Sequence, residues 1–312
     1  MIKNWLKKTG YVALLWTISI VQAQAQVKDT SAFSEPILID EVIIRAGNFD
    51  SKSFIDRIRK DTTFYKAFKT LHIVSFNAEN DIKILNKKSK KVKASLLSET
   101  KQIYRGGCRT MNVLSEKTTG NFYDRKGDYN YYTAELYASL FFTKGKICGE
   151  DNIVAGNTHY STKGKSTIEK SKSQLKQLIF NPGTKVSGVP FMGNKAAIFE
   201  PEIARMYDFS IHAEEKNGIP SFLFEARPKP EYAHKVVINV FKTWFRQSDY
   251  SIISRDYALS YNTAVYDFNV VMHVDLAQIG NKLLPTFISY RGNWHALTKG
   301  REIGSFTTRF YY

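Results

Sequence analysis

Six histidines are the side chains best suited to proton transfer, because the ordinary pKa of an imidazole lies near neutral pH. They are scattered along the chain, at His72, His159, His212, His234, His273 and His295. No two have the spacing of a motif such as H-E-x-x-H, so the sequence predicts no metal site.

His273 lies two residues from Asp275. It could face His295 and Arg291 across adjacent strands, which makes this cluster the one candidate for proton transfer. The alternative is a solvated polar face of a sheet.

Other catalytic motifs are incomplete. Residues 164–167 read GKST, the end of a phosphate loop, but the glycine required five residues earlier is His159. A G-x-S-x-G nucleophile elbow is absent from the sequence. Carboxylates are plentiful, yet the sequence alone places no two of them at the separation that a glycosidase requires. We therefore expect no catalytic residue, no metal and no cofactor. A cell-envelope hydrolase acting on glycan or lipid is the alternative.

The chain has two cysteines, Cys108 and Cys148. In an oxidising compartment such a pair usually forms a disulfide. A zinc site would require close spacing and neighbouring histidine ligands, and neither is present. We predict a Cys108–Cys148 disulfide, which closes a loop of about 40 residues and stabilises the fold by about 4 kcal/mol in the chain-entropy model.

The N-terminus has the pattern of a secretory signal peptide. Three lysines among residues 3–8 precede the apolar run Tyr11–Val21, and Ala23–Ala25 supplies the small residues of a cleavage site. The run is shorter than the about 20 residues that span a bilayer, although an uncleaved anchor is the alternative. We predict that residues 1–25 are a signal peptide and that the protein is exported to the periplasm or to the periphery of the outer membrane.

The chain is strongly basic, with a formal net charge of +16. Removal of residues 1–25 removes three lysines and leaves +13. For an exported protein this charge favours an anionic membrane surface over nucleic acid, which is not an expected partner. The alternative is a solvated lysine surface that confers solubility.

Helical and extended patterns alternate in the first half of the mature chain. Residues 26–50 are predicted to form a polar leader and a first strand, Ile37–Arg45. Apolar residues at helical spacing follow from Phe54 to Phe68, with a break expected near Asp61.

A lysine-rich turn at residues 86–91 is predicted to join two strands of a hairpin. Two further helices are expected, at Tyr132–Phe142 and at Ser166–Phe180. The domain prediction is a single α+β domain, residues 51–312, with a possible inserted segment at 100–165.

Strands dominate from Ala196 onward, separated by short polar turns as in an antiparallel meander. The predicted strands are KAAIF, YDFSIHA, PSFLFEAR, KVVINVFKTWF, YSIISRDYALSY, DFNVVMHVDL, LLPTFISYRG, NWHALTK and SFTTRFYY. Within one of them, Phe268, Val270, Met272, Val274 and Leu276 share an apolar face that needs a cover. The fold class that we predict is α+β: a curled antiparallel sheet, or incomplete β-barrel, with helices packed on its concave face.

Residues 207–310 resemble the periplasmic lipoprotein-carrier superfamily. The resemblance rests on SIISRDYALSY, on DFNVVMHVDL, and on LLPTFISYRGNW after a glycine turn. It implies a half-barrel that holds acyl chains over helices. The signal peptide and the Tyr/Lys-rich composition also resemble those of exported proteins of Bacteroidota.

The predicted function is non-catalytic binding of an acyl chain or other apolar ligand, in envelope lipid or lipoprotein handling, with a lipid or lipoprotein as partner. An incomplete barrel can leave an apolar cavity. The residues expected to line it are Phe268, Val270, Met272, Leu284 and Ile288. Three alternatives remain open. Helices could fill the concave face completely. The aromatic C-terminus TTRFYY resembles the terminal strand of an outer-membrane β-barrel. The chain could also be a structural surface protein.

Overall fold

The computed structural model describes residues 37–39, 42–45, 51–149, 177–185, 194–262, 266–296 and 299–312. The predicted signal peptide lies outside the described residues. So does most of the helix predicted at Ser166–Phe180, of which residues 177–180 are described and are helical. None of the helices in the described ranges is long and apolar enough to cross a membrane.

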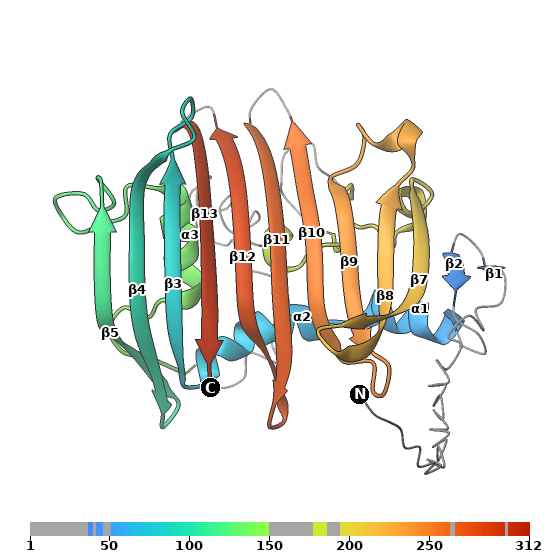
Figure 1. Cartoon of the computed structure of the whole chain (residues 1–312), viewed down its shortest axis with the longest axis horizontal. Helices are drawn as coiled ribbons and strands as arrows, with labels where there is room; N and C mark the ends of the chain where they lie inside the picture. The colour runs from blue at the N-terminus through green and yellow to red at the C-terminus, as the bar shows by residue number, and fades with distance from the viewer. Residues whose placement is uncertain are drawn as a thin grey trace, which may run out of the picture.

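One sheet dominates the described part of the chain (Figure 1). Its strands are β1 Ile37–Ile39, β2 Val42–Arg45, β3 Phe76–Leu85, β4 Val92–Arg105, β5 Cys108–Thr119, β6 Ile147–Cys148, β7 Tyr207–Lys216, β8 Ile219–Pro228, β9 Ile238–Arg246, β10 Ile252–Asn262, β11 Tyr266–Ile279, β12 Lys282–Ala296 and β13 Lys299–Tyr311. Their order is β1-β2-β7-β8-β9-β10-β11-β12-β13-β3-β4-β5-β6. The sheet is therefore open, with β1 and β6 at its two ends.

Almost all neighbouring strands are antiparallel, and β7 to β13 follow one another as the predicted meander. The pair β2–β7 is parallel. The first hairpin, β3–β4, joins the sheet at the far side of the last strand. Ile303 of β13 pairs with Leu85 of β3, and Tyr311 pairs with Asn77. This connection sets residues more than 200 positions apart side by side.

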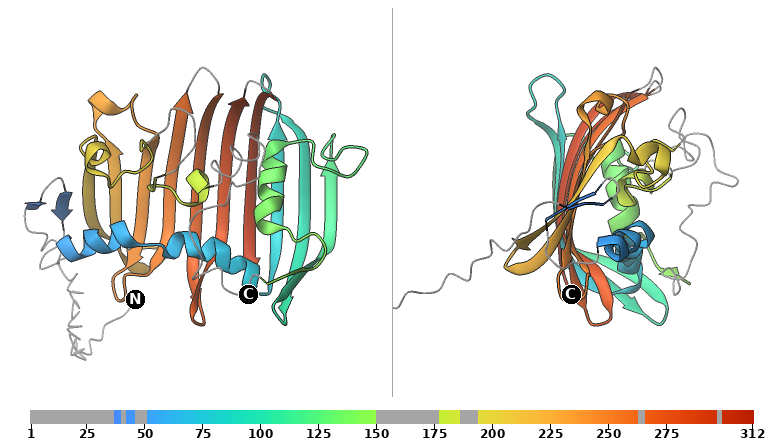
Figure 2. Two further views of the ribbon diagram at one scale, coloured as in Figure 1. Left: turned by 180° about the vertical axis from the view of Figure 1, so that it is seen from behind. Right: turned by 90° about the vertical axis from the view of Figure 1, so that its right-hand side faces the viewer.

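The helices lie on one face of the curled sheet (Figure 2). They are α1 Ser51–Lys60, α2 Thr63–Thr70, α3 Tyr132–Phe141 and α5 Pro201–Ala204, with 3₁₀ turns η1 Leu71–Ile73 and η2 Pro230–Tyr232. Helix α2 packs against β12, and α3 packs against β13. The predicted fold class, a curled antiparallel sheet with helices on its concave face, is confirmed.

The break between α1 and α2 lies at Asp61, as predicted. Its carboxylate Oδ1 accepts hydrogen bonds from the backbone N–H of Thr63 (3.1 Å) and from the Thr63 hydroxyl (2.6 Å). These bonds satisfy donors at the start of α2, which favours a new helix over continuation of α1.

Period-two alternation places the core on the helix side of the sheet. In β3, alternate residues from Phe76 onward are buried. In β11, Phe268, Val270 and Met272 are at most 2% exposed, whereas Val271 between them is 51% exposed. The apolar face predicted for this strand is therefore the face that the helices cover.

Several elements differ from the prediction. The predicted strand NWHALTK is not a separate strand, because residues 293–296 end β12 and Lys299 begins β13. The strand expected at Ile37–Arg45 is two short strands, β1 and β2, which pair with each other. The predicted strand KAAIF forms turns instead. Strand β5, Cys108–Thr119, lies in the sheet beside β4, although its sequence predicted no strand.

Candidate functional site

The five residues predicted to line a ligand cavity occupy different places. Phe268, Val270, Met272 and Ile288 belong to the main buried cluster, under the helix layer. Leu284 is also buried, at 1% exposure, but lies outside that cluster. The sheet therefore brings four of the five together, in the centre of the concave face.

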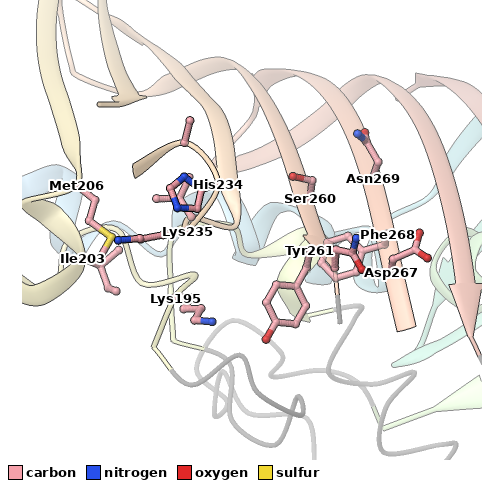
Figure 3. Close-up of a pocket in the computed structure, with 13 residues that line it drawn as sticks. Lys195, Ile203, Met206, His234, Lys235, Ser260, Tyr261, Asp267, Phe268 and Asn269 are labelled. Carbon is pink, nitrogen blue, oxygen red and sulfur yellow. The ribbon is translucent and has the colours of Figure 1, made fainter. Parts of the chain in front are cut away.

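A cavity of about 680 Å³ lies where β10 ends and β11 begins, and of the five residues only Phe268 lines it. Figure 3 shows Ile203 and Met206 on one side of the space and Tyr261 and Phe268 on the other. We call it the β10–β11 cavity. It is lined by Lys195, Ile203, Met206, Ala233, His234, Lys235, Val236, Ser260, Tyr261, Asn262, Asp267, Phe268 and Asn269.

One wall of the β10–β11 cavity continues into an aromatic cluster. The ring centroids of Tyr261 and Phe268 are 6.1 Å apart, and those of Phe268 and Trp294 are 5.1 Å apart. Tyr132 of α3 follows at 5.7 Å from Trp294. Contacts of this kind stabilise beyond the area that they bury, so the cluster strengthens the packing of this wall.

The charged groups at the β10–β11 cavity favour an anion. Lys195 lies over the Tyr261 ring, with Nζ 5.6 Å from the centroid, and Lys235 also lines the space. The one carboxylate among the described lining residues belongs to Asp267. It accepts a hydrogen bond of 2.7 Å from Arg301 Nη2, so its charge is neutralised within the protein.

The histidine cluster predicted from sequence is not assembled. The register between β11 and β12 places Ser289 opposite His273, and His295 opposite Asp267. The expectation that His273 faces His295 and Arg291 is therefore wrong. The physical reason is the length of β12, because His295 is displaced by six residues from the position opposite His273.

His273 instead lies between two carboxylates on the outer face of the sheet. It contacts Asp256 through Nδ1 and Asp275 through Nε2, the latter at 3.0 Å. The hydrogen bond with Asp256, followed by that with Asp275, raises the pKa of His273 to about 9. At neutral pH the ring is therefore a cation held by two acids. It offers no free base for a hydrolase.

A row of alternating charges crosses this outer face. The sheet register aligns Glu225 with Lys242, Lys242 with Asp256, and Asp256 with His273. Glu225 also accepts from Arg227 Nε at 2.8 Å. Opposite charges directly across strands stabilise a sheet, which is sufficient to explain this row. Among the described residues, no group of three or more His, Cys, Asp or Glu side chains could hold a metal ion.

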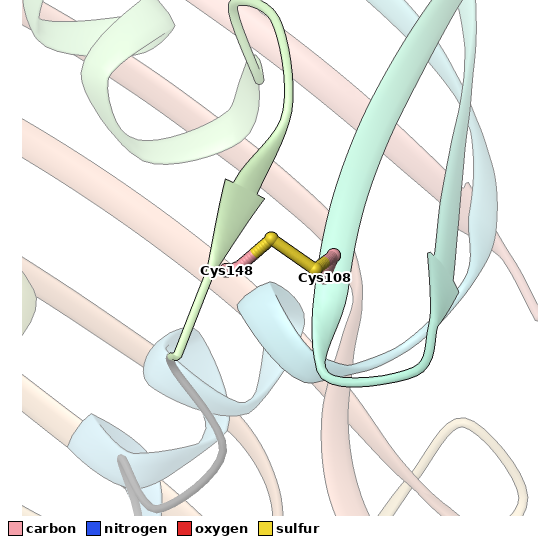
Figure 4. The surroundings of a disulfide bond; sticks show 2 residues. All are labelled: Cys108 and Cys148. Carbon is pink, nitrogen blue, oxygen red and sulfur yellow. A yellow bond between two sulfur atoms is a disulfide. The ribbon is translucent and has the colours of Figure 1, made fainter.

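Cys108 and Cys148 are joined by a disulfide (Figure 4). The bond links the start of β5 to β6, the last strand on that side of the sheet. It closes a separation of 40 residues and fastens the segment that follows α3 to the edge of the sheet.

No family model and no curated protein matches the chain. Solved structures that match include an outer membrane lipoprotein-sorting protein domain from Vibrio parahaemolyticus, with 12% identity over 80% of this chain and 89% of that chain and a TM-score of 0.25. A DUF1329 family protein from Desulfovibrio piger has 11% identity, coverages of 80% and 92%, and a TM-score of 0.22. A LolA superfamily protein from Nitrosomonas europaea has 10% identity, coverages of 80% and 92%, and a TM-score of 0.20. At these scores the matches carry no argument about function.

Proposed function

We propose that this protein is an exported, non-catalytic binding protein that holds an amphiphile with an acyl chain and an anionic head in the β10–β11 cavity. The observation that carries the proposal is the lining of that cavity. Ile203, Met206 and Phe268 provide apolar surface, and Lys195 and Lys235 lie beside them. An apolar wall with a few placed charges is the usual composition of a small-molecule site.

The energetics support an acyl chain. Each methylene group removed from water contributes about 0.8 kcal/mol, so a short stretch of chain already gives appreciable affinity. The volume of about 680 Å³ lies in the range usual for ligand pockets, about 300–1,000 Å³. An ammonium group near the end of the chain adds a charge-assisted hydrogen bond to a carboxylate or phosphate head.

Several features support export and a role in envelope lipid or lipoprotein handling. The predicted signal peptide at residues 1–25 would direct the chain out of the cytosol. A disulfide persists in an oxidising compartment such as the periplasm. The net charge of +13 for the processed chain would attract anionic membrane surfaces from which a lipid ligand could be taken.

The first test is native mass spectrometry of residues 26–312, purified from a periplasmic extract without detergent. Organic extraction would then identify any co-purifying molecule. We expect a discrete adduct of lipid mass. The proposal would be overturned if the protein shows only its apo mass and takes up neither added fatty acid nor added phospholipid.

A charged residue introduced into the β10–β11 cavity tests whether the acyl chain binds there. We expect Met206→Glu to weaken binding of a dansyl-labelled fatty acid by about tenfold or more, because the new carboxylate lies on apolar surface and repels the head group. The matched control is Val240→Glu, since Val240 is a 37% exposed apolar residue of β9 that does not line this cavity. Equal loss in both variants would argue against the site.

A further inference from the structure

Arg255 is an arginine buried on the apolar face of the sheet. It is 5% exposed, and along β10 it shares the inward face with Tyr257 and Leu259. Its guanidinium lies over two aromatic rings, 4.1 Å from the centroid of Phe64 on α2 and 4.9 Å from that of Phe241 on β9. Two ring faces thus hold the guanidinium plane in place.

The hydrogen bonds of Arg255 leave most of its donors unused. Nε donates to Thr243 Oγ1 at 2.9 Å. Within the described residues, its two terminal nitrogens form no ion pair with a carboxylate and donate no hydrogen bond to a carbonyl. Asp61 acts on the guanidinium through its charge but forms no ion pair with it, so an anion that reaches these donors would stabilise the buried cation further.

A second, smaller cavity lies beside this guanidinium, between the α1–α2 break and residues 181–185. Its volume is about 180 Å³, and we call it the Arg255 cavity. Three cations and two carboxylates are among its lining residues, which gives it an excess of one positive charge. These charged residues are Arg59, Lys185, Arg255, Asp61 and Glu200.

Arg255 and Asp61 offer complementary hydrogen-bonding groups. Burial lowers the pKa of Arg255 to about 10, and the charge of Asp61 partly opposes that effect, so the guanidinium stays protonated at neutral pH. Asp61 uses Oδ1 to start α2, whereas its Oδ2 is buried without a hydrogen-bond partner. A ligand that both accepts from Arg255 and donates to Asp61 would satisfy both groups.

We propose that the Arg255 cavity binds a phosphate group, carried either by inorganic phosphate or by a phospholipid head. A guanidinium matches the geometry of phosphate oxygens with two parallel donors. Phosphate near neutral pH retains a proton, and a phospholipid head carries hydroxyl or ammonium donors, so either can donate to Asp61. The volume holds such a group with a few waters and is below the range for a larger ligand. No residue lines both cavities, so this proposal stands independently of acyl-chain binding.

Titration calorimetry with sodium phosphate at constant ionic strength tests the role of Arg255. We expect saturable binding to the wild-type protein. Binding should be weakened about tenfold or more in Arg255→Lys, which keeps the charge but loses the two-donor geometry. Arg291→Met is the matched control, because Arg291 is exposed on the outer face of β12. Phosphate binding that is unchanged in Arg255→Lys would overturn the assignment.

Two comparisons define the ligand. Sulfate has the shape of phosphate but carries no proton near neutral pH, so the wild-type protein should prefer phosphate. Asp61→Asn should remove that preference while it keeps the start of α2, since asparagine caps helices as well as aspartate does. An unchanged preference would exclude the proposed pairing with Asp61.

The source of the phosphate is distinguished by using dihexanoyl phosphatidylglycerol beside inorganic phosphate. Saturable binding of inorganic phosphate assigns a free-phosphate site. Binding of the lipid alone, lost in Arg255→Lys and retained in Met206→Glu, assigns a head-group site that is separate from the β10–β11 cavity. Failure of both probes to bind the wild-type protein would overturn the proposal, whatever the outcome for fatty acids.

Discussion

The hydroxyl group of Tyr257 donates a hydrogen bond of 2.6 Å to the backbone carbonyl of Ile179. The same oxygen lies 2.9 Å from Met272 Sδ on the neighbouring strand. This contact joins the middle of the sheet to the helical residues 177–180. The contact thereby holds residues 177–180 against the buried face of the sheet.

We expect Tyr257→Phe to lower the free energy of unfolding by about 1–3 kcal/mol, because the buried carbonyl of Ile179 would lose its donor. Thermal or urea unfolding measures the change. Tyr104→Phe, at a half-buried position at the end of β4, is the matched control. A loss of equal size in the control would show that the Ile179 contact has no special role.

The approach of α3 to the sheet depends on Gly304. A Cβ atom at this position would clash with Thr133 Oγ1 and would lie 2.8 Å from Thr133 Cβ. We expect Gly304→Ala to destabilise the protein by about 1–3 kcal/mol through overpacking. On the same strand, Gly300→Ala would meet only the flexible end of Lys87, at 3.2 Å, and should change stability little. Similar unfolding temperatures for the two variants would contradict this explanation.

The ion pairs of His273 predict a pH dependence. The folded-state pKa of about 9 lies above the ordinary 6.5. The contribution of the His273 ion pairs to the free energy of unfolding is therefore complete below about pH 6.5. It declines as the pH rises and is lost above about pH 9. Urea unfolding of the wild-type protein and His273→Gln across this range should show a difference that shrinks with pH. A difference that stays constant with pH would exclude stabilisation by the protonated His273. His234→Gln is the control for the loss of an imidazole at another position.

Removal of the disulfide should lower stability by up to about 4 kcal/mol, the chain-entropy value for a loop of this length. The double variant Cys108→Ser/Cys148→Ser and the wild-type protein treated with a reductant should unfold at the same, lower temperature. Cys148 is exposed, so the reductant reaches the bond in the folded protein. An unfolding temperature unaffected by either treatment would show that the disulfide contributes nothing to the stability of the fold.

Local pattern was sufficient to predict much of the fold. The start of α2 follows from the hydrogen-bonding capacity of Asp61, and the buried face of β11 follows from alternation beginning at Phe268. Strand β5 escaped prediction because its residues from Asn112 to Thr119 are exposed, so neither face carries an apolar signal. The pairing of β13 with β3 is a non-local contact, for which the sequence has no local signal.

The candidate sites were harder to predict. Phe268 was expected to line a cavity, and it does. Ile203 and Met206, which also line that cavity, come from α5 and from the turn before β7. They are distant from Phe268 in the sequence, and only the fold brings them close to it. For Arg255 a signal did exist. It occupies an inward position in the alternating run that continues with Tyr257 and Leu259, where a charged side chain is unusual.

The pairing of β13 with β3 also has a consequence for the order of biosynthesis. One edge of β3 stays without its partner until β13 has been made, more than 200 residues later, so the central sheet is completed only after that strand has been synthesised. Late closure over such a sequence distance slows folding, and until then the unpaired edge can join another chain and aggregate. For a protein with the predicted export signal, the same delay keeps the sheet from reaching its final structure before β13 has been synthesised.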